Sequence, residues 1–172
     1  QADLTQWLVP GQVHRLSLFK EGTGNLNYGL VQRHYVPWEG PPPGDGPLHI
    51  EVEYDRTNLV VDDTVTATVR VSNDDVEYAD MVMVDLGIPP GFDAVTADLD
   101  ALVAQRVFSK YELTQRQLLL YFTEVQPERP VEFQYRLVAR DPIRAQAPRS
   151  RVYSYYNPDV ETEALPVEFE VQ

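Results

Sequence analysis

Apolar and polar side chains alternate one by one in several stretches after residue 47, and this two-residue period restricts the fold more than any other feature. The apolar positions of the three clearest stretches are Leu48, Ile50, Val52 and Tyr54; Val65, Ala67, Val69 and Val71; and Val131, Phe133, Tyr135, Leu137 and Ala139. Such alternation places one face of a strand on a core and the other in solvent, which is typical of antiparallel sheets.

Further strands are predicted between these stretches. Residues 81–88 and 118–122 are more continuously apolar and suit central strands, and residues 107–113, 152–156 and 167–171 bring the total to eight. Eight short strands separated by turn signals predict an all-β protein, an antiparallel β-sandwich.

One segment, residues 95–104, departs from the two-residue period. Its apolar residues recur at helical spacing and are Leu99, Leu102 and Val103. Thr96 is placed to cap a helix, and Asp98 and Asp100 fall in the first turn, where acids suit the helix dipole. The segment predicts one short helix that crosses between strands.

The chain before residue 48 is organised differently. The stretch PWEGPPPGDGP at residues 37–47 holds five prolines and three glycines, which exclude a helix or a central strand and predict a linker. Residues 13–19 and 26–36 resemble strands, with a turn-forming sequence at residues 21–24. Two strands alone bury too little surface to be stable in water, so we expect them to belong to a larger sheet.

Composition excludes several classes of function. The net charge is -13, so nucleic acid is not expected as a partner, because phosphates would be repelled. The absence of cysteine excludes disulfides, thiolate metal sites and a cysteine nucleophile. No apolar run approaches the roughly 18 residues of a membrane span. The first residues show no signal-peptide pattern, which fits either a cytosolic protein or a chain whose start was trimmed.

Motifs for catalysis or cofactor binding are missing. The sequence has no HExxH, GxSxG, Walker or GxGxxG pattern, so we expect neither an enzyme nor a cofactor. The three histidines, His14, His34 and His49, are not spaced as metal ligands. Residues 73–80 could supply some oxygen ligands for calcium, although an Asx-rich hairpin turn is the favoured interpretation.

Three tyrosines lie close together at Tyr153, Tyr155 and Tyr156. Their rings could stack on sugars, and a carbohydrate-binding β-sandwich is therefore the alternative function. Alternate packing against a sheet is the favoured interpretation, because strands generally favour tyrosine. Asn157 and Pro158 are then expected to turn the chain, and residues 159–163 to form a solvated loop before the last strand.

Several segments, read in order, resemble the C-terminal receptor-binding domain of α2-macroglobulins and complement thioester proteins. They are residues 81–92, ending in Gly91-Phe92, and residues 110–113, 118–122, 133–137 and 151–158, the last reading RVYSYYNP. The resemblance covers residues 48–172. Residues 21–28 and 32–37 resemble the returning strands of the CUB-type domain that precedes it in this family. The expected organisation is thus a CUB-like part at 1–37, a linker at 38–47 and a receptor-binding-like macroglobulin domain at 48–172.

The resemblance implies a non-catalytic interaction and structural module of a protease-trapping endopeptidase inhibitor, which is repositioned when the parent protein is cleaved. The implied partners are the other domains of the parent and, through the parent, proteases. The implied location is extracytoplasmic. The family's thioester motif would lie upstream of Gln1.

Receptor binding in animal members of the family depends on two helix lysines, whose positions fall on Thr96 and Asp100 here. Neither residue carries a positive charge, and a carboxylate would be repelled by an acidic receptor module. We therefore do not expect an animal-type endocytic receptor to bind.

Overall fold

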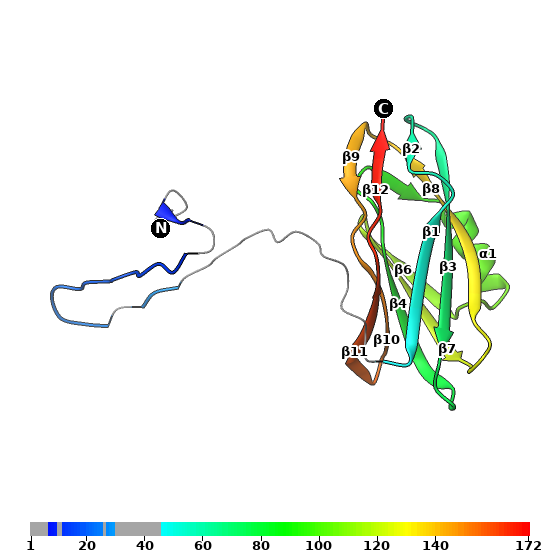
Figure 1. Ribbon diagram of the computed structural model, residues 1–172, viewed down its shortest axis with the longest axis horizontal. Helices are drawn as coiled ribbons and strands as arrows, with labels where there is room; N and C mark the ends of the chain where they lie inside the picture. Colours follow the sequence, from blue (N-terminus) through cyan, green and yellow to red (C-terminus); the bar gives the residue numbers. More distant parts are fainter. Residues whose placement is uncertain (1–6, 10–11, 26, 30–45) are drawn as a thin grey trace. The chain divides into compact units, whose positions relative to one another are not determined.

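The structure, a computed structural model, describes residues 7–9, 12–25, 27–29 and 46–172 (Figure 1). The chain forms two compact units, Gln1–Pro37 and Trp38–Gln172. Among the described residues, no helix is long and apolar enough to cross a bilayer.

The second unit is a β-sandwich (Figure 1). One sheet has the strand order β1-β3-β8-β5, the facing sheet β11-β10-β4-β7-β6, and a smaller third sheet β2-β12-β9. The bounds are β1 Leu48–Tyr54, β2 Asn58–Leu59, β3 Thr64–Asn73, β4 Ala79–Gly87, β5 Phe92–Ala94, β6 Lys110–Leu113, β7 Gln117–Val125, β8 Val131–Ala139, β9 Ile143–Gln146, β10 Ser150–Ser154, β11 Asn157–Ala164 and β12 Glu168–Val171. Only the β2–β12 pair is parallel within this described unit. The predicted antiparallel β-sandwich is confirmed.

The alternating residues form the core as the sequence predicts. The inward positions of β3 are fully buried; they are Val65, Ala67, Val69 and Val71. Phe108, Phe122 and Phe133 pack around one another, with ring centroids 5.8 to 6.2 Å apart. The edge-to-face and tilted arrangements are those that aromatic pairs prefer, and together these rings join the two larger sheets.

The single helix, α1, spans Thr96–Ala104 and buries Leu99 completely. The prediction that Thr96 caps the helix is wrong: Thr96 is the first helical residue, and Val95 occupies the N-cap without a side-chain hydrogen bond. Asp98 connects the first turn of the helix to a neighbouring strand. Its carboxylate accepts hydrogen bonds from the backbone N, Nε and Nη2 of Arg136 on β8, at 3.1, 2.8 and 2.7 Å.

Four strands were missed by the sequence pattern, namely β2, β5, β9 and β11. The predicted strand at 107–113 is also shorter and begins at Lys110. The predicted solvated loop at 159–163 is wrong, because these residues belong to β11, which pairs with β10. Asn157 and Pro158 do not turn the chain; the turn precedes them at Tyr155 and Tyr156. A proline is tolerated here because β11 is an edge strand with an irregular register.

In the first unit, residues 12–25 contain no strand, so the predicted strand at 13–19 is not formed. No partner strand pairs with it among the described residues, and Val13 and Phe19 are almost fully exposed. The turn at Gly22 and Gly24 is present, with positive φ angles of 91° and 109° that suit glycine. Most of the predicted strand at 26–36, residues 38–45 of the linker and His34 lie outside the described residues.

Candidate functional site

The β10–β11 turn presents two neighbouring tyrosines to solvent. Tyr155 and Tyr156 connect Ser154 to Asn157 and are 56% and 75% exposed. Their rings meet edge to face with centroids 5.5 Å apart. Exposed aromatic rings add nothing to the core, so the turn is a candidate contact surface.

Met81 lies beside this turn in an unusual backbone conformation. Its φ of 50° falls in the left-handed region, which is costly for a residue with a side chain. Met81 is also missing from the otherwise continuous β4–β7 register, and its carbonyl accepts a hydrogen bond from the Tyr155 N–H at 2.9 Å. Such strained residues concentrate at functional sites. We call Met81, Tyr155 and Tyr156 the aromatic knob.

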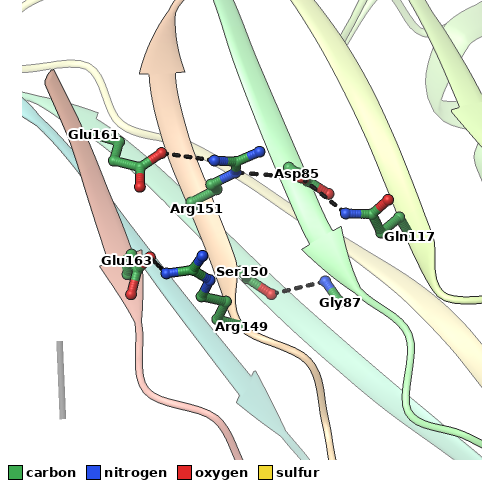
Figure 2. Close-up of polar contacts among 8 residues, drawn as sticks. All are labelled: Asp85, Gly87, Gln117, Arg149, Ser150, Arg151, Glu161 and Glu163. Atoms are coloured by element: carbon green, nitrogen blue, oxygen red, sulfur yellow. Dashed lines mark hydrogen bonds and ion pairs between the residues drawn. The ribbon is translucent and has the colours of Figure 1, made fainter. Parts of the chain in front are cut away.

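Polar side chains hold the strands next to the knob on the outer face of the five-stranded sheet (Figure 2). Arg151 donates from Nε to Asp85 Oδ2 at 3.3 Å and from Nη1 to Glu161 Oε2 at 2.8 Å. Gln117 also donates to Asp85 Oδ2, at 3.2 Å. These bonds connect β7, β4, β10 and β11 across the sheet.

A second set of bonds lies beside the first, about two residues further from the knob along the chain (Figure 2). Arg149 donates to Glu163 Oε1 at 2.6 Å, and the Gly87 N–H donates to the Ser150 hydroxyl at 3.0 Å. The paired charges are partly buried, which strengthens their interaction relative to pairs in open solvent.

Cations cover two other tyrosines on the same face. Lys110 Nζ lies 3.9 Å from the centre of the Tyr121 ring, and the Arg151 guanidinium carbon lies 5.2 Å from that of Tyr153. The hydrogen bond from Tyr121 to Glu112, at 2.8 Å, raises the pKa of Tyr121 and lowers that of Glu112. Burial raises the pKa of Tyr153. Sugar stacking on Tyr153 would compete with Arg151, so Tyr155 and Tyr156 are the better candidates for the carbohydrate alternative, which stays a prediction.

Asn73 in the acidic 73–80 segment has a structural role. Its buried amide donates to the carbonyls of Glu77 and Val125, at 2.8 and 3.1 Å, and accepts from the Asp75 N–H at 3.0 Å. Across the described part of the chain, no group of three or more His, Cys, Asp or Glu side chains could hold a metal ion. His49 Nε2 lies 3.2 Å from Asp74 Oδ2, at the start of the same segment.

Thr96 and Asp100 both lie exposed on α1. Asp100 Oδ1 accepts a hydrogen bond from the Tyr111 hydroxyl at 2.7 Å, which raises the pKa of Tyr111. The structure therefore gives Asp100 a contact within the domain, and the partner-binding role of both residues stays a prediction.

Sequence reasoning missed Met81 and the Arg151 bonds as parts of a site. The signal for the bonds was present: Asp85 interrupts an apolar strand, and basic residues 149 and 151 match acidic residues 161 and 163 in spacing. The sequence alone does not show which of these charges bond, because that depends on the pairing of β11 with β10.

Comparison with known proteins identifies the family. Residues 77–165, just over half of the chain, match the sequence profile of the A-macroglobulin receptor binding domain family. No curated protein matches significantly.

Solved structures show the same fold. Escherichia coli alpha-2-macroglobulin from domain MG7 to the C-terminus is 18% identical, with a TM-score of 0.68, over 79% of this chain and 25% of that one. A Salmonella alpha-2-macroglobulin mutant is 19% identical, with a TM-score of 0.66, over 79% of this chain and 10% of that one. Escherichia coli alpha-2-macroglobulin activated by porcine elastase is 19% identical, with a TM-score of 0.63, over 79% of this chain and 14% of that one.

This chain therefore spans about a quarter or less of those proteins. The matched region extends from just before β4 to just after β11 and includes α1 and the aromatic knob. The chain belongs to the A-macroglobulin receptor binding domain family.

Proposed function

We propose that this chain is the C-terminal interaction module of an α2-macroglobulin-like protease-trapping protein and that the aromatic knob contacts another domain of the same protein. The knob is the observation that carries this proposal. Tyrosine and methionine are enriched at protein interfaces. Here Tyr155 and Tyr156 are exposed on the turn, and Met81, also exposed, lies on β4 and bonds the turn through its carbonyl.

The proposed mechanism is rigid-body movement. Similar structures include Escherichia coli alpha-2-macroglobulin in its native conformation and after activation by elastase or trypsin. By analogy, cleavage of the parent would break the contact at the knob and reposition the whole domain, with no chemistry in this chain. The module would act outside the cytoplasm, where the parent meets proteases.

The division of the chain is part of the same proposal. Residues 1–37 would be the end of a CUB-like domain that is completed by upstream parts of the parent, and residues 38–47 would be a linker. Leu16, Leu18 and Phe19 are exposed, which supports a missing partner for this unit. Thr96 and Asp100 lack the charge that the family's animal receptor requires, so that receptor would not be a partner.

The test compares the parent protein with and without the knob. We expect Tyr155→Ala and Tyr156→Ala together to weaken the contact in the uncleaved parent. Limited proteolysis should then cleave the module about tenfold faster than in the unmutated parent. Leu165→Ala, which removes an exposed apolar side chain outside the knob, is the control. Equal proteolysis of all three proteins would refute the contact.

A second measurement addresses the module by itself. The 172-residue chain alone should not inhibit endopeptidases, because trapping would need the rest of the parent. Full trapping of a protease by this fragment would overturn the assignment.

A further inference from the structure

We infer that Arg151 is a positioning residue that fixes the aromatic knob by joining β4 to β11. The inference rests on the proposed function only for the use of the knob, since the positioning itself can be tested in this chain alone. It is carried by three features: the direction of the ion pairs, the site of the register shift and the hydrogen bond of Tyr155.

The ion pairs are diagonal. Arg151 is opposite Glu163 in the β10–β11 register, yet it binds Glu161, two residues nearer to the knob. Arg149 in turn binds Glu163. Both arginines therefore lean along β10 toward the tyrosine turn, and the Arg151 guanidinium comes to lie near the Tyr153 ring.

Glu161 marks the end of regular pairing between β10 and β11. Tyr153 pairs with Glu161, but the next residue, Ser154, pairs with Asn157, so residues 158–160 have no partner on β10. Such bulges redirect the chain and the side chains beside them. Holding Glu161 therefore fixes the point at which β11 leaves its regular register, and with it the path of the chain back to Tyr156.

Arg151 fixes that point relative to the centre of the sheet. Asp85 lies on β4, directly opposite Arg151, and is buried among the strands. Met81 belongs to the same strand and accepts the hydrogen bond from Tyr155. The turn is thus tied to β4 at two places, through Arg151 and through the Met81 carbonyl.

The geometry requires arginine. Arg151 uses Nε for Asp85 and Nη1 for Glu161, two separate nitrogens of one planar group. A lysine keeps the charge but presents it as one nitrogen on a flexible stem, which does not reproduce two donors held in fixed positions by a rigid plane. Arg151→Lys is therefore a sharper test than removal of the charge, which would leave Asp85 buried without its cation.

The experiment measures backbone hydrogen exchange in the 172-residue chain by NMR, with Tyr155 as the reporter and Val69 in β3 as the reference. We expect Arg151→Lys and Glu161→Gln each to speed exchange of the Tyr155 amide by about tenfold and to leave Val69 unchanged. Arg144→Lys is the matched control, because Arg144 makes a 2.7 Å ion pair with Glu168 in a different sheet.

Two results would overturn the inference. Unchanged Tyr155 exchange in Arg151→Lys would show that Arg151 does not position the turn. Equal acceleration at Tyr155 and Val69 would show that Arg151 only adds to overall stability. Neither result depends on docking to the parent, so a knob that is positioned by Arg151 but unused in the parent would refute the proposed function alone.

Discussion

Gly87 lies at the end of β4, where the backbone of another segment passes very close. A Cβ atom at this position would come within 2.1 Å of the Pro148 carbonyl oxygen. The Gly87 N–H also donates to the buried Ser150 hydroxyl, so the two segments cannot separate without losing this hydrogen bond. The need for glycine here comes from the close approach of Pro148.

We therefore expect Gly87→Ala to lower the free energy of unfolding by about 1–3 kcal/mol, the usual cost of forcing extra atoms into a packed site. Urea denaturation followed by circular dichroism measures the change. Gly29→Ala is the control, since a Cβ there meets nothing within 4 Å. If the two variants were equally stable, the close packing of Pro148 on Gly87 would be disproved.

At the scale of single elements, Asp98 and Arg136 connect α1 to β8 through hydrogen bonds. The Arg136 carbonyl accepts a hydrogen bond from the Val95 N–H, and its side chain and N–H bind the Asp98 carboxylate. The hydrogen bonds from Arg136 lower the pKa of Asp98 below its ordinary value of 3.8. We call these bonds, which tie the first turn of α1 to β8, the Asp98 clamp.

This clamp should make stability depend on pH. Because the folded pKa of Asp98 is below the unfolded one, its contribution is present above about pH 4 and is lost as the pH falls through the folded pKa. We expect Asp98→Asn to cost about 1–2 kcal/mol at pH 7, allowing for partial exposure of the pair. The difference from the unmutated chain should shrink at pH 2.5, as measured by urea denaturation at both values. A difference that stayed constant with pH would contradict the role of the charge.

The C-terminus of α1 carries a strained residue. Arg106 has a φ of 61°, and the N–H groups of Arg106 and Val107 bond to the carbonyls of Val103 and Leu102 at 2.9 and 3.0 Å. This is the Schellman arrangement, in which the left-handed position usually holds glycine. Arginine therefore occupies the left-handed position at which glycine usually ends a helix.

Arg106→Gly should stabilise the chain by about 0.5–1 kcal/mol, because relief of left-handed strain exceeds the added entropy of the unfolded glycine. Arg106→Ala removes the same charge and keeps the strain, so it should bring no gain. Thermal unfolding of both variants distinguishes the effects. If alanine stabilised the chain as much as glycine, charge rather than backbone strain would be the cause.

The elements that could be predicted from the sequence are those with long apolar patterns. The inward residues of β3 and β8 alternate over nearly the whole strand, and burial follows directly. By contrast, β11 reads NPDVETEA and is held by pairing with β10 and by arginine–glutamate bonds, which exist only in the folded chain. Short strands such as β2, with two residues, show no period at all.

The candidate site was predictable in part. The favoured interpretation, that the tyrosines pack alternately against a sheet, is wrong for Tyr155 and Tyr156, which are exposed. Their exposure depends on where the turn falls, and the sequence pattern predicts it at Asn157 and Pro158 instead of at the tyrosines themselves. Met81 could not be found, because its left-handed backbone reflects strand register and a hydrogen bond from a residue 74 positions later. Register between distant strands is a property of the packed sheets.

At the scale of the whole molecule, the buried apolar core lies entirely within the second unit among the described residues. Its members extend from Leu48 to Val171 and include residues of every sheet. The described apolar residues of the first unit are instead exposed, as at Trp7 and Phe19. The second unit thus contains what a domain needs to fold by itself.

We therefore expect a chain that begins at Gly46 to unfold cooperatively, with a free energy of unfolding within about 0.5 kcal/mol of that of the 172-residue chain. Deletion of residues 1–45 removes both tryptophans, Trp7 and Trp38, so circular dichroism rather than tryptophan fluorescence should follow the urea transition. A loss of more than about 1 kcal/mol, or a broadened transition, would mean that the first unit packs on the sandwich and stabilises it. The proposed boundary at residues 37–48 would then be wrong, because the two units would share one core.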